Sequence, residues 1–254
     1  MKTLLEAKNV SMKFGGLMAV NDVDMTINEG TIHSLIGPNG AGKTTFFNVL
    51  SGIYVPSAGK IEFMGVNILK KSAYKRAEMG VTRTFQNILL FNGLSVLENV
   101  MIGFHSRCAS NFMNTIIQTP KMKREERRCY EKARDMIAFM NIESDERTIV
   151  DGLPYGKKRL VEIARALASE PKLIMLDEPC AGMNPTETEE IIDIVYKIRD
   201  LGITILLVEH NMRVAMGISD IVTVLDHGVK ICEGLPDMVK NDSSVIEAYL
   251  GKED

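Results

Sequence analysis

The chain is poor in cysteine and has no long apolar run. Its four cysteines lie far apart in 254 residues, without a Cys-x-x-Cys pair, so neither a disulfide framework nor a zinc site is expected. No uncharged apolar run approaches the ~20 residues that a membrane span needs. Lys and Arg number 30 against 33 Asp and Glu, a net charge of −3, which argues against bulk attraction to nucleic acid. These absences favour a soluble intracellular protein.

What the chain does contain is typical of a packed α/β protein. It is 45% hydrophobic and 25% charged, enough apolar material for a sizeable core. Apolar runs alternate with helical patterns from end to end, which favours strands joined by helices and a parallel sheet. The strands are expected at residues 4–10, 20–27, 32–36, 81–85, 173–176, 204–208 and 221–225.

One stretch departs from this alternation. From roughly residue 95 to 142 there is little strand signal and charge concentrates, which predicts a helical subdomain inserted into the α/β core. Its basic side chains are Lys121, Lys123, Arg124, Arg127, Arg128, Lys132 and Arg134. Because acidic residues are interleaved and aromatics are few, a solvated helix face is favoured over a nucleic-acid site.

A complete phosphate-binding loop follows the expected strand at 32–36. Its residues are Gly37, Pro38, Asn39, Gly40, Ala41, Gly42, Lys43 and Thr44, with Thr45 continuing into an apolar helix start. This run matches G-x-x-x-x-G-K-[ST] without a mismatch, and its glycines let backbone N–H groups curl round a phosphate. Lys43 is predicted to reach the β- and γ-phosphates and Thr44 to hold Mg²⁺. The chain is therefore expected to bind a nucleoside triphosphate.

An acidic pair ends the expected strand at 173–176. Asp177 would emerge at the carboxyl end of the parallel sheet, where ligands bind, and it is assigned to Mg²⁺. Glu178 beside it is the candidate that polarises the attacking water. An acidic helix cap before Pro179 would explain the pair without chemistry, but the phosphate loop makes the catalytic interpretation the stronger one.

Three further residues make the chain resemble the ATPase subunit of an ABC transporter over nearly its whole length. Gln86, in Thr-Phe-Gln-Asn, matches the family's Q-loop glutamine, and His210 matches the switch histidine. Phe14 stands where the family has an aromatic ring against adenine. The resemblance implies ATP and Mg²⁺ as ligands, with Gln86 at the metal and the attacking water and His210 at the γ-phosphate. It also implies an α/β fold: a phosphate-loop NTPase core with an antiparallel β subdomain and an inserted helical subdomain.

The family's signature motif, Leu-Ser-Gly-Gly-Gln, is altered in this chain. The matching residues, here called the signature segment, are Leu153, Pro154, Tyr155, Gly156 and Lys157. In the family this segment contacts the γ-phosphate of ATP held by a second subunit. Pro154 has neither a hydroxyl nor a backbone N–H, so one phosphate contact must be missing. Gly156 is kept at the position where the backbone must approach phosphate. Our hypothesis is that the charge of Lys157 replaces the hydrogen bond that Pro154 cannot make.

The altered motifs Leu-Pro-Tyr-Gly and Ala-Gly-Met-Asn-Pro resemble the subgroup that serves branched-chain (hydrophobic) amino acid importers. The resemblance implies one ATPase domain over residues 1–254, with a core lobe of 1–86 and 163–254 and a helical subdomain at about 87–162. It implies a second ATPase subunit, identical or related, and integral membrane subunits as partners, with a solute-binding protein acting indirectly. The chain is then peripheral, at the cytoplasmic face of the cell membrane, and has no nucleic-acid partner.

Other interpretations stay open. A lipid or lipopolysaccharide exporter ATPase would share the core motifs. A non-transport ABC ATPase usually carries tandem units, coiled coils or basic patches, and this sequence has a single set of motifs. A GTPase or small-molecule kinase would explain the phosphate loop alone, but it would leave His210 and the signature segment unexplained.

Overall fold

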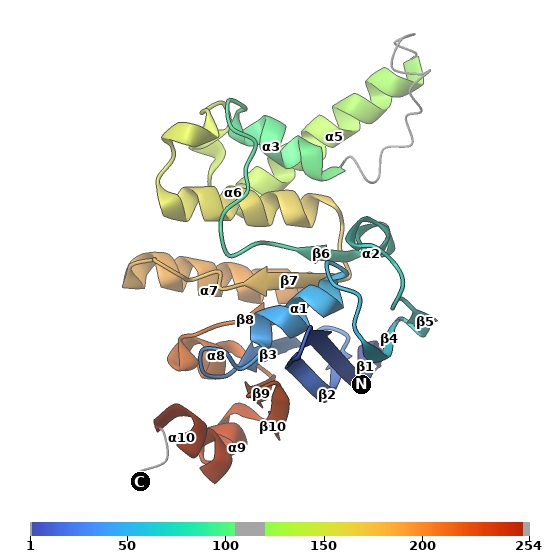
Figure 1. Ribbon diagram of the computed structural model, residues 1–254. Helices are drawn as coiled ribbons and strands as arrows, with labels where there is room; N and C mark the ends of the chain where they lie inside the picture. The colour runs from blue at the N-terminus through green and yellow to red at the C-terminus, as the bar shows by residue number, and fades with distance from the viewer. Residues whose placement is uncertain (1, 105–119, 251–254) are drawn as a thin grey trace.

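A six-stranded sheet organises the core in the computed structural model, which describes residues 2–104 and 120–250. Its strands are ordered β10-β9-β3-β8-β7-β6 (Figure 1). Their bounds are β3 Ile32–Ile36, β6 Val81–Arg83, β7 Leu173–Asp177, β8 Thr204–Val208, β9 Ile221–Asp226 and β10 Val229–Gly234. All pair in parallel except β10, which runs antiparallel to β9. Every residue of β3, β7 and β8 is buried, as in a sheet covered on both faces.

A second, antiparallel sheet is joined to the first through a shared core. Its strands are β1 Thr3–Phe14, β2 Leu17–Asn28, β4 Ala58–Phe63 and β5 Val66–Asn67, in the order β2-β1-β4-β5. Helix α1 (Lys43–Ser51) presents Phe46, Phe47 and Leu50 to the apolar faces of both sheets in one cluster. The phosphate loop is thus anchored at the seam between the sheets.

Helices cover the other face of the large sheet and form a separate layer. Helices α3 (Val96–Ile102), α5 (Pro120–Phe139) and α6 (Tyr155–Ala168) share one apolar cluster with α7 (Pro185–Asp200), and Figure 1 shows α3, α5 and α6 stacked beyond β6 and β7. The remaining elements are α2 Ala73–Met79, η2 Glu143–Asp145, η3 Val150–Gly152, α8 Met212–Ile218, α9 Pro236–Lys240 and α10 Ser243–Leu250. None of the helices in the described ranges is long and apolar enough to cross a membrane.

The expected fold class is confirmed, and most strands lie where the apolar runs place them. The strands at 32–36 and 204–208 match the prediction residue for residue, whereas β1 and β2 are longer than expected. Sequence patterns missed β4, β5 and β10. The reason is composition: β4 alternates Lys60 and Glu62 with apolar residues and β10 carries Lys230 and Glu233, so neither contains an apolar run.

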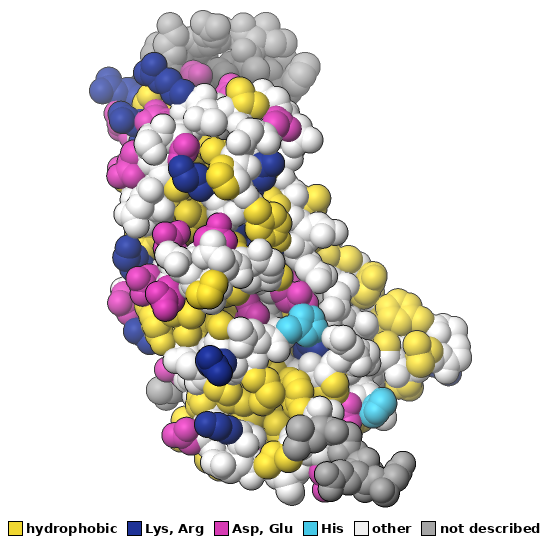
Figure 2. Space-filling view, turned by 90° about the vertical axis from the view of Figure 1, so that its left-hand side faces the viewer, with side chains coloured by type: hydrophobic (Ala, Val, Ile, Leu, Met, Phe, Trp, Pro, Cys, Tyr) yellow, Lys and Arg dark blue, Asp and Glu magenta, His cyan; other side chains and the backbone are white. Residues whose placement is uncertain are grey.

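The charged stretch is helical, as predicted. Arg127 pairs with Glu131 one turn later at 2.9 Å, with the two side chains 81% and 61% exposed, so this face of α5 is solvated. On the face shown in Figure 2, Lys and Arg gather at the end where Figure 1 has α5, with Asp and Glu among them. Residues 105–119, including Cys108, and the side chains of Lys121 and Lys123 lie outside the described part of the chain.

Candidate active site

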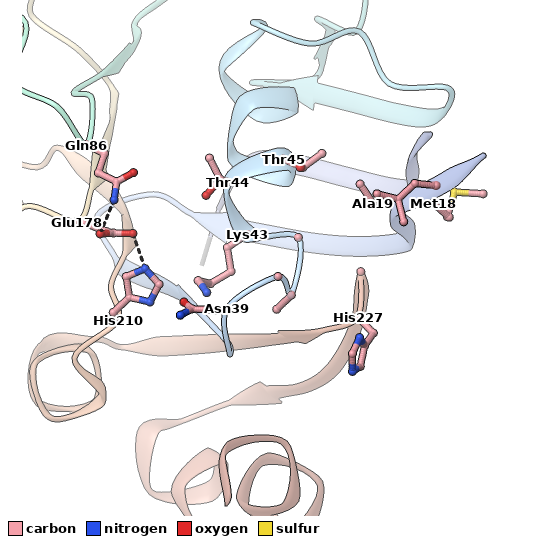
Figure 3. A pocket seen from close by; sticks show the side chains of 15 residues that line it. Met18, Ala19, Asn39, Lys43, Thr44, Thr45, Gln86, Glu178, His210 and His227 are labelled. Carbon is pink, nitrogen blue, oxygen red and sulfur yellow. Dashed lines mark hydrogen bonds and ion pairs between the residues drawn. The ribbon is translucent and has the colours of Figure 1, made fainter. Parts of the chain in front are cut away.

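The phosphate loop opens onto a cavity of about 590 Å³. The cavity is lined by residues 39–45, by Leu17, Met18 and Ala19 of β2, by Gln86, Glu178 and His210, and by the turn of His227 and Gly228. Figure 3 shows Lys43 and Thr44 in the middle, with Gln86, Glu178 and His210 along one wall. Segments that are far apart in the sequence therefore meet at one site.

The loop depends on a glycine that packs against β2. Gly42 has φ +93°, and a Cβ at this position would lie 2.4 Å from the carbonyl oxygen of Ala19, so only glycine fits. Next to it, Lys43 Nζ donates to the carbonyl oxygens of Gly37 at 2.7 Å and Pro38 at 2.8 Å. Burial lowers the pKa of Lys43 below its ordinary value, and the charge of Glu178 opposes that shift. The ammonium group is held by the loop that a phosphate would enter.

Asp177 is paired with an arginine that sequence patterns did not single out. Arg83 Nη2 lies 2.6 Å from Asp177 Oδ2, and the two side chains are only 9% and 4% exposed. Its guanidinium carbon lies 4.7 Å from the centroid of the Phe47 ring and 5.0 Å from that of Phe85, and Nη1 donates to Ser51 Oγ of α1 at 3.0 Å. Arg83 therefore ties the carboxylate to the helix that follows the phosphate loop and neutralises it.

The three catalytic candidates form one chain of contacts. His210 Nε2 lies 2.6 Å from Glu178 Oε1, and Gln86 Nε2 donates to Glu178 Oε2 at 3.1 Å (Figure 3). Glu178 is nearly buried, with its side chain 9% exposed, while that of His210 is 47% exposed. The carboxylate is thus oriented from both sides, as a group that polarises water needs to be.

Gln86 lies on a loop that is held by helix α6. Arg159 donates from Nη1 to the carbonyl oxygen of Phe85 at 2.7 Å and from Nη2 to that of Gln86 at 2.8 Å. Glu162 accepts from Phe85 N and Leu89 N, both at 3.4 Å, and from Arg159 at 2.7 Å. Burial raises the pKa of Glu162, and the charge of Arg159 opposes this shift. No sequence motif pointed to this pair, because its contacts join segments more than 70 positions apart.

The comparison with protein families matches this geometry to a known class. The sequence profile described as ABC transporter matches residues 20–181, which include the phosphate loop, Gln86 and Glu178. The chain belongs to the ABC transporter family. As a member, it is an ATP-hydrolysing transporter subunit that binds nucleotide.

Relatives of this ABC ATPase are similar over its full length. The high-affinity branched-chain amino acid transport ATP-binding protein BraF of Pseudomonas aeruginosa is 39% identical over 252 residues, 99% of each chain. The corresponding protein LivG of Escherichia coli is 38% identical over 250 residues, 98% of each chain. A crystal structure of an ABC transporter cassette in its ADP conformation superposes with a TM-score of 0.86 at 31% identity, covering 99% of this chain and 100% of that one. A second profile, described as branched-chain amino acid ATP-binding cassette transporter, matches residues 229–254.

The signature segment of this ABC ATPase lies apart from the cavity. Leu153 is buried, and Pro154 stands at the N-cap of α6 without a side-chain cap. Tyr155 is 45% exposed. Lys157 Nζ lies 2.6 Å from Asp145 Oδ2, so its proposed contact with a phosphate stays a prediction that requires this pair to open.

Two other residues have contacts within the chain that their family positions did not predict. A Cβ on Gly156 would lie 2.8 Å from Glu187 Oε1, so Gly156 packs against the end of a side chain of α7. The ring of Phe14 packs edge-on against Tyr54, 5.4 Å between centroids. Leu17 and Met18 line the cavity, whereas Phe14 is not among its lining residues. The stacking of Phe14 on adenine stays a prediction.

The predicted magnesium ligands have suitable donor chemistry. The hydroxyl of Thr44 and the amide of Gln86 line the cavity and offer oxygen, which Mg²⁺ prefers. The carboxylate of Asp177 also offers oxygen, but it is not among the lining residues and its Oδ2 is paired with Arg83. No cluster of three or more His, Cys, Asp or Glu that could hold a metal occurs among the described residues.

Proposed function

We propose that this ABC ATPase powers the import of branched-chain (hydrophobic) amino acids through membrane subunits. The proposal is supported by the match of residues 229–254 to the branched-chain profile and by relatives of that name that align end to end. The single observation that carries the chemistry is the contact chain from Gln86 through Glu178 to His210, opposite Lys43 and Thr44 in one cavity.

In the proposed reaction, the residues that line the cavity have separate roles. The loop N–H groups and Lys43 hold the β- and γ-phosphates of ATP. Glu178 polarises the attacking water, and His210 contacts the γ-phosphate. Gln86 positions the water against Glu178. Thr44, Gln86 and Asp177 would hold Mg²⁺, which would supply positive charge against the developing charge on the phosphates.

The site is completed in this proposal by a second ATPase subunit, identical or related. The signature segment would serve the nucleotide of the neighbour, so two chains facing head-to-tail would enclose two ATP molecules. Closure excludes water, and hydrolysis reopens the interface. In one chain the signature segment lies outside the cavity that holds the phosphate loop, which supports such an arrangement.

The proposed membrane partners dock where the Gln86 loop meets the helical layer. A groove of about 270 Å³ lies there, lined by Asn87, Ile88, Leu90, Asn92, Val150, Tyr155 and Lys158. It adjoins both Gln86 and the signature segment, so a helix bound in it would reach both. The chain would then be peripheral, at the cytoplasmic face of the membrane, with a solute-binding protein acting indirectly.

The competing transporter class is a lipopolysaccharide exporter. The export ATP-binding protein LptB of Haemophilus influenzae is 34% identical over 251 residues, less than BraF at 39%. The match at residues 229–254 also favours the amino acid importer. A non-transport ABC ATPase has no observation in its favour.

Cells without this chain are expected to lose most ATP-driven uptake of labelled leucine, isoleucine and valine. Re-expression of the wild-type chain should restore uptake, whereas the Glu178→Gln variant should not, because this variant cannot hydrolyse ATP. Labelled uptake over the first minute is the measurement. Unchanged uptake together with accumulation of lipopolysaccharide inside the cell would favour the exporter instead.

The purified chain is expected to show specific ATPase activity that rises with protein concentration, by about an order of magnitude or more across its dimerisation range, because each chain holds two incomplete half-sites. Turnover is measured at saturating ATP, with molecular mass recorded by light scattering in the same samples. Full turnover by a strictly monomeric sample would contradict the shared site.

A further inference from the structure

A buried carboxylate beside the catalytic pair has no part in the mechanism so far. Glu209 directly follows β8, precedes His210 and is only 3% exposed. Its Oε1 accepts a hydrogen bond from the backbone N–H of Cys180 at 3.1 Å. Cys180 comes two positions after Glu178, so this bond joins the segment that follows β7 to the segment that follows β8.

The joined segment contains a strained backbone position. Glu178 has φ +46°, a left-handed conformation that is costly for a side chain with a Cβ and persists only where the surroundings impose it. Two backbone bonds help: Glu178 N donates to Val208 O at 2.9 Å, and Ala181 N donates to Glu178 O at 3.1 Å. Cys180 lies between Glu178 and Ala181 in the sequence, and its backbone N–H donates to the Glu209 side chain.

On the opposite side of His210, Asn211 is held by helix α8, and its backbone is also hydrogen-bonded to Glu209. Asn211 caps helix α8, its Oδ1 accepting from the backbone N–H groups of Arg213 at 3.0 Å and Val214 at 3.4 Å. His210 therefore stands between a helix cap and Glu209. His210 contacts the side chain of Glu178, whereas Glu209 bonds to the backbone of the turn that follows Glu178.

We propose that Glu209 is a positioning residue that sets the spacing of Glu178 and His210, an inference that rests on the proposed hydrolytic roles of those two residues. By holding the Cys180 N–H, Glu209 keeps the turn at Glu178 closed against β8. This fixes the 2.6 Å contact between Glu178 Oε1 and His210 Nε2. A misplacement of about 1 Å in such a site can cost ~10²-fold in rate.

The Cys180 thiol is also hydrogen-bonded to Glu209, but it does not fix the backbone. Burial and then the adjacent Glu209 raise the pKa of Cys180 to about 12, so the group stays a neutral thiol. The bond that joins the two segments uses the backbone N–H. What matters at position 209 is therefore an acceptor oxygen at the right reach, and glutamine keeps one such oxygen where glutamate has two.

The test compares Glu209→Gln with Glu209→Leu in the full chain. The Leu variant removes the acceptor, and we expect kcat for ATP to fall by about tenfold or more while KM stays within about twofold, because the phosphate loop is untouched. The Gln variant keeps the acceptor, and we expect it to retain at least about a third of wild-type kcat. A residue that only stabilises the fold would not give this split and this rescue.

Two further variants keep the test decisive. Glu209→Asp withdraws the oxygen by one methylene without adding apolar bulk, and it should lower kcat even if the Leu variant does not fold. Glu233→Leu is the matched control: this carboxylate also accepts a hydrogen bond, from Thr223 Oγ1 at 2.7 Å, but it lies on β10, and its loss should leave kcat unchanged.

The outcomes separate this inference from the proposed function. Wild-type kcat in both Glu209→Leu and Glu209→Asp, or an equal fall in Gln and Leu, overturns the positioning role. If Glu178→Gln hydrolyses ATP at the wild-type rate, the hydrolytic assignment itself fails, whatever Glu209 does. Loss of activity in Glu178→Gln with full activity in Glu209→Leu and Glu209→Asp overturns the positioning role alone.

Discussion

Replacing Glu178 by glutamine is expected to lower ATP turnover by about 10²–10⁴-fold, the range that a general base contributes. Nucleotide affinity should stay within about threefold, because the amide keeps the shape of the side chain and the phosphate loop is unaltered. The hydrogen bond from Gln86 at 3.1 Å and the contact with His210 at 2.6 Å both end on this carboxylate. An amide cannot take a proton from water there.

The variant is measured by phosphate release and by equilibrium binding of a fluorescent ATP analogue. Because bound ATP is not consumed, size-exclusion chromatography should show dimers of the variant in the presence of ATP and monomers in the presence of ADP. Glu189→Gln, an exposed position on α7, is the control and should behave as wild type. Loss of ATP binding in Glu178→Gln, or turnover near the wild-type rate, would contradict the role given to this residue.

Replacing Arg159 by methionine is expected to destabilise the chain by roughly 3–5 kcal/mol, as when one partner of a buried ion pair is removed. Arg159 and Glu162 are 0% and 1% exposed and 2.7 Å apart. Without the guanidinium, Glu162 keeps a buried charge, and the carbonyl oxygens of Phe85 and Gln86 lose their donors. For a chain of this length, each kcal/mol is worth about 2–4 °C in melting temperature.

Urea unfolding of the full chain measures this difference. Arg127→Met is the control, because Arg127 and Glu131 are 81% and 61% exposed and such a pair contributes about 1 kcal/mol or less. The double variant Arg159→Met/Glu162→Leu should recover part of the loss, since no charge then remains unpaired. A cost below about 1 kcal/mol for Arg159→Met, or strict additivity in the double variant, would be the contrary result.

The parts of the site that are continuous in sequence could be predicted from it. The phosphate loop lies on adjacent residues: its glycines shape the backbone that surrounds the phosphate, and the side chains of Lys43 and Thr44 come next in the sequence. Asp177 ends strand β7 and Glu178 directly follows it, after four apolar residues, so their place at the sheet edge follows from the strand itself. The strands at 32–36 and 204–208 could be predicted for a similar reason: every residue in them is buried, and most of them are apolar.

The partners of those residues could not be predicted in this way. Arg83 lies 94 positions from Asp177, and Glu209 lies 29 positions from Cys180. Neither has a local pattern that distinguishes it from an ordinary charged residue. Each becomes buried against its partner only because neighbouring parallel strands carry their ends to the same edge.

By itself, then, the sequence determined the fold class, the phosphate loop and the acidic pair, because these depend on periodicity and on neighbours along the chain. Tertiary structure alone decided that Arg83 neutralises Asp177, that α6 holds the Gln86 loop and that Glu209 braces the turn at Glu178. The physical reason is that a charge can be buried only beside its partner. Which residues become partners depends on the order of strands in the sheet, and no short stretch of sequence contains that order.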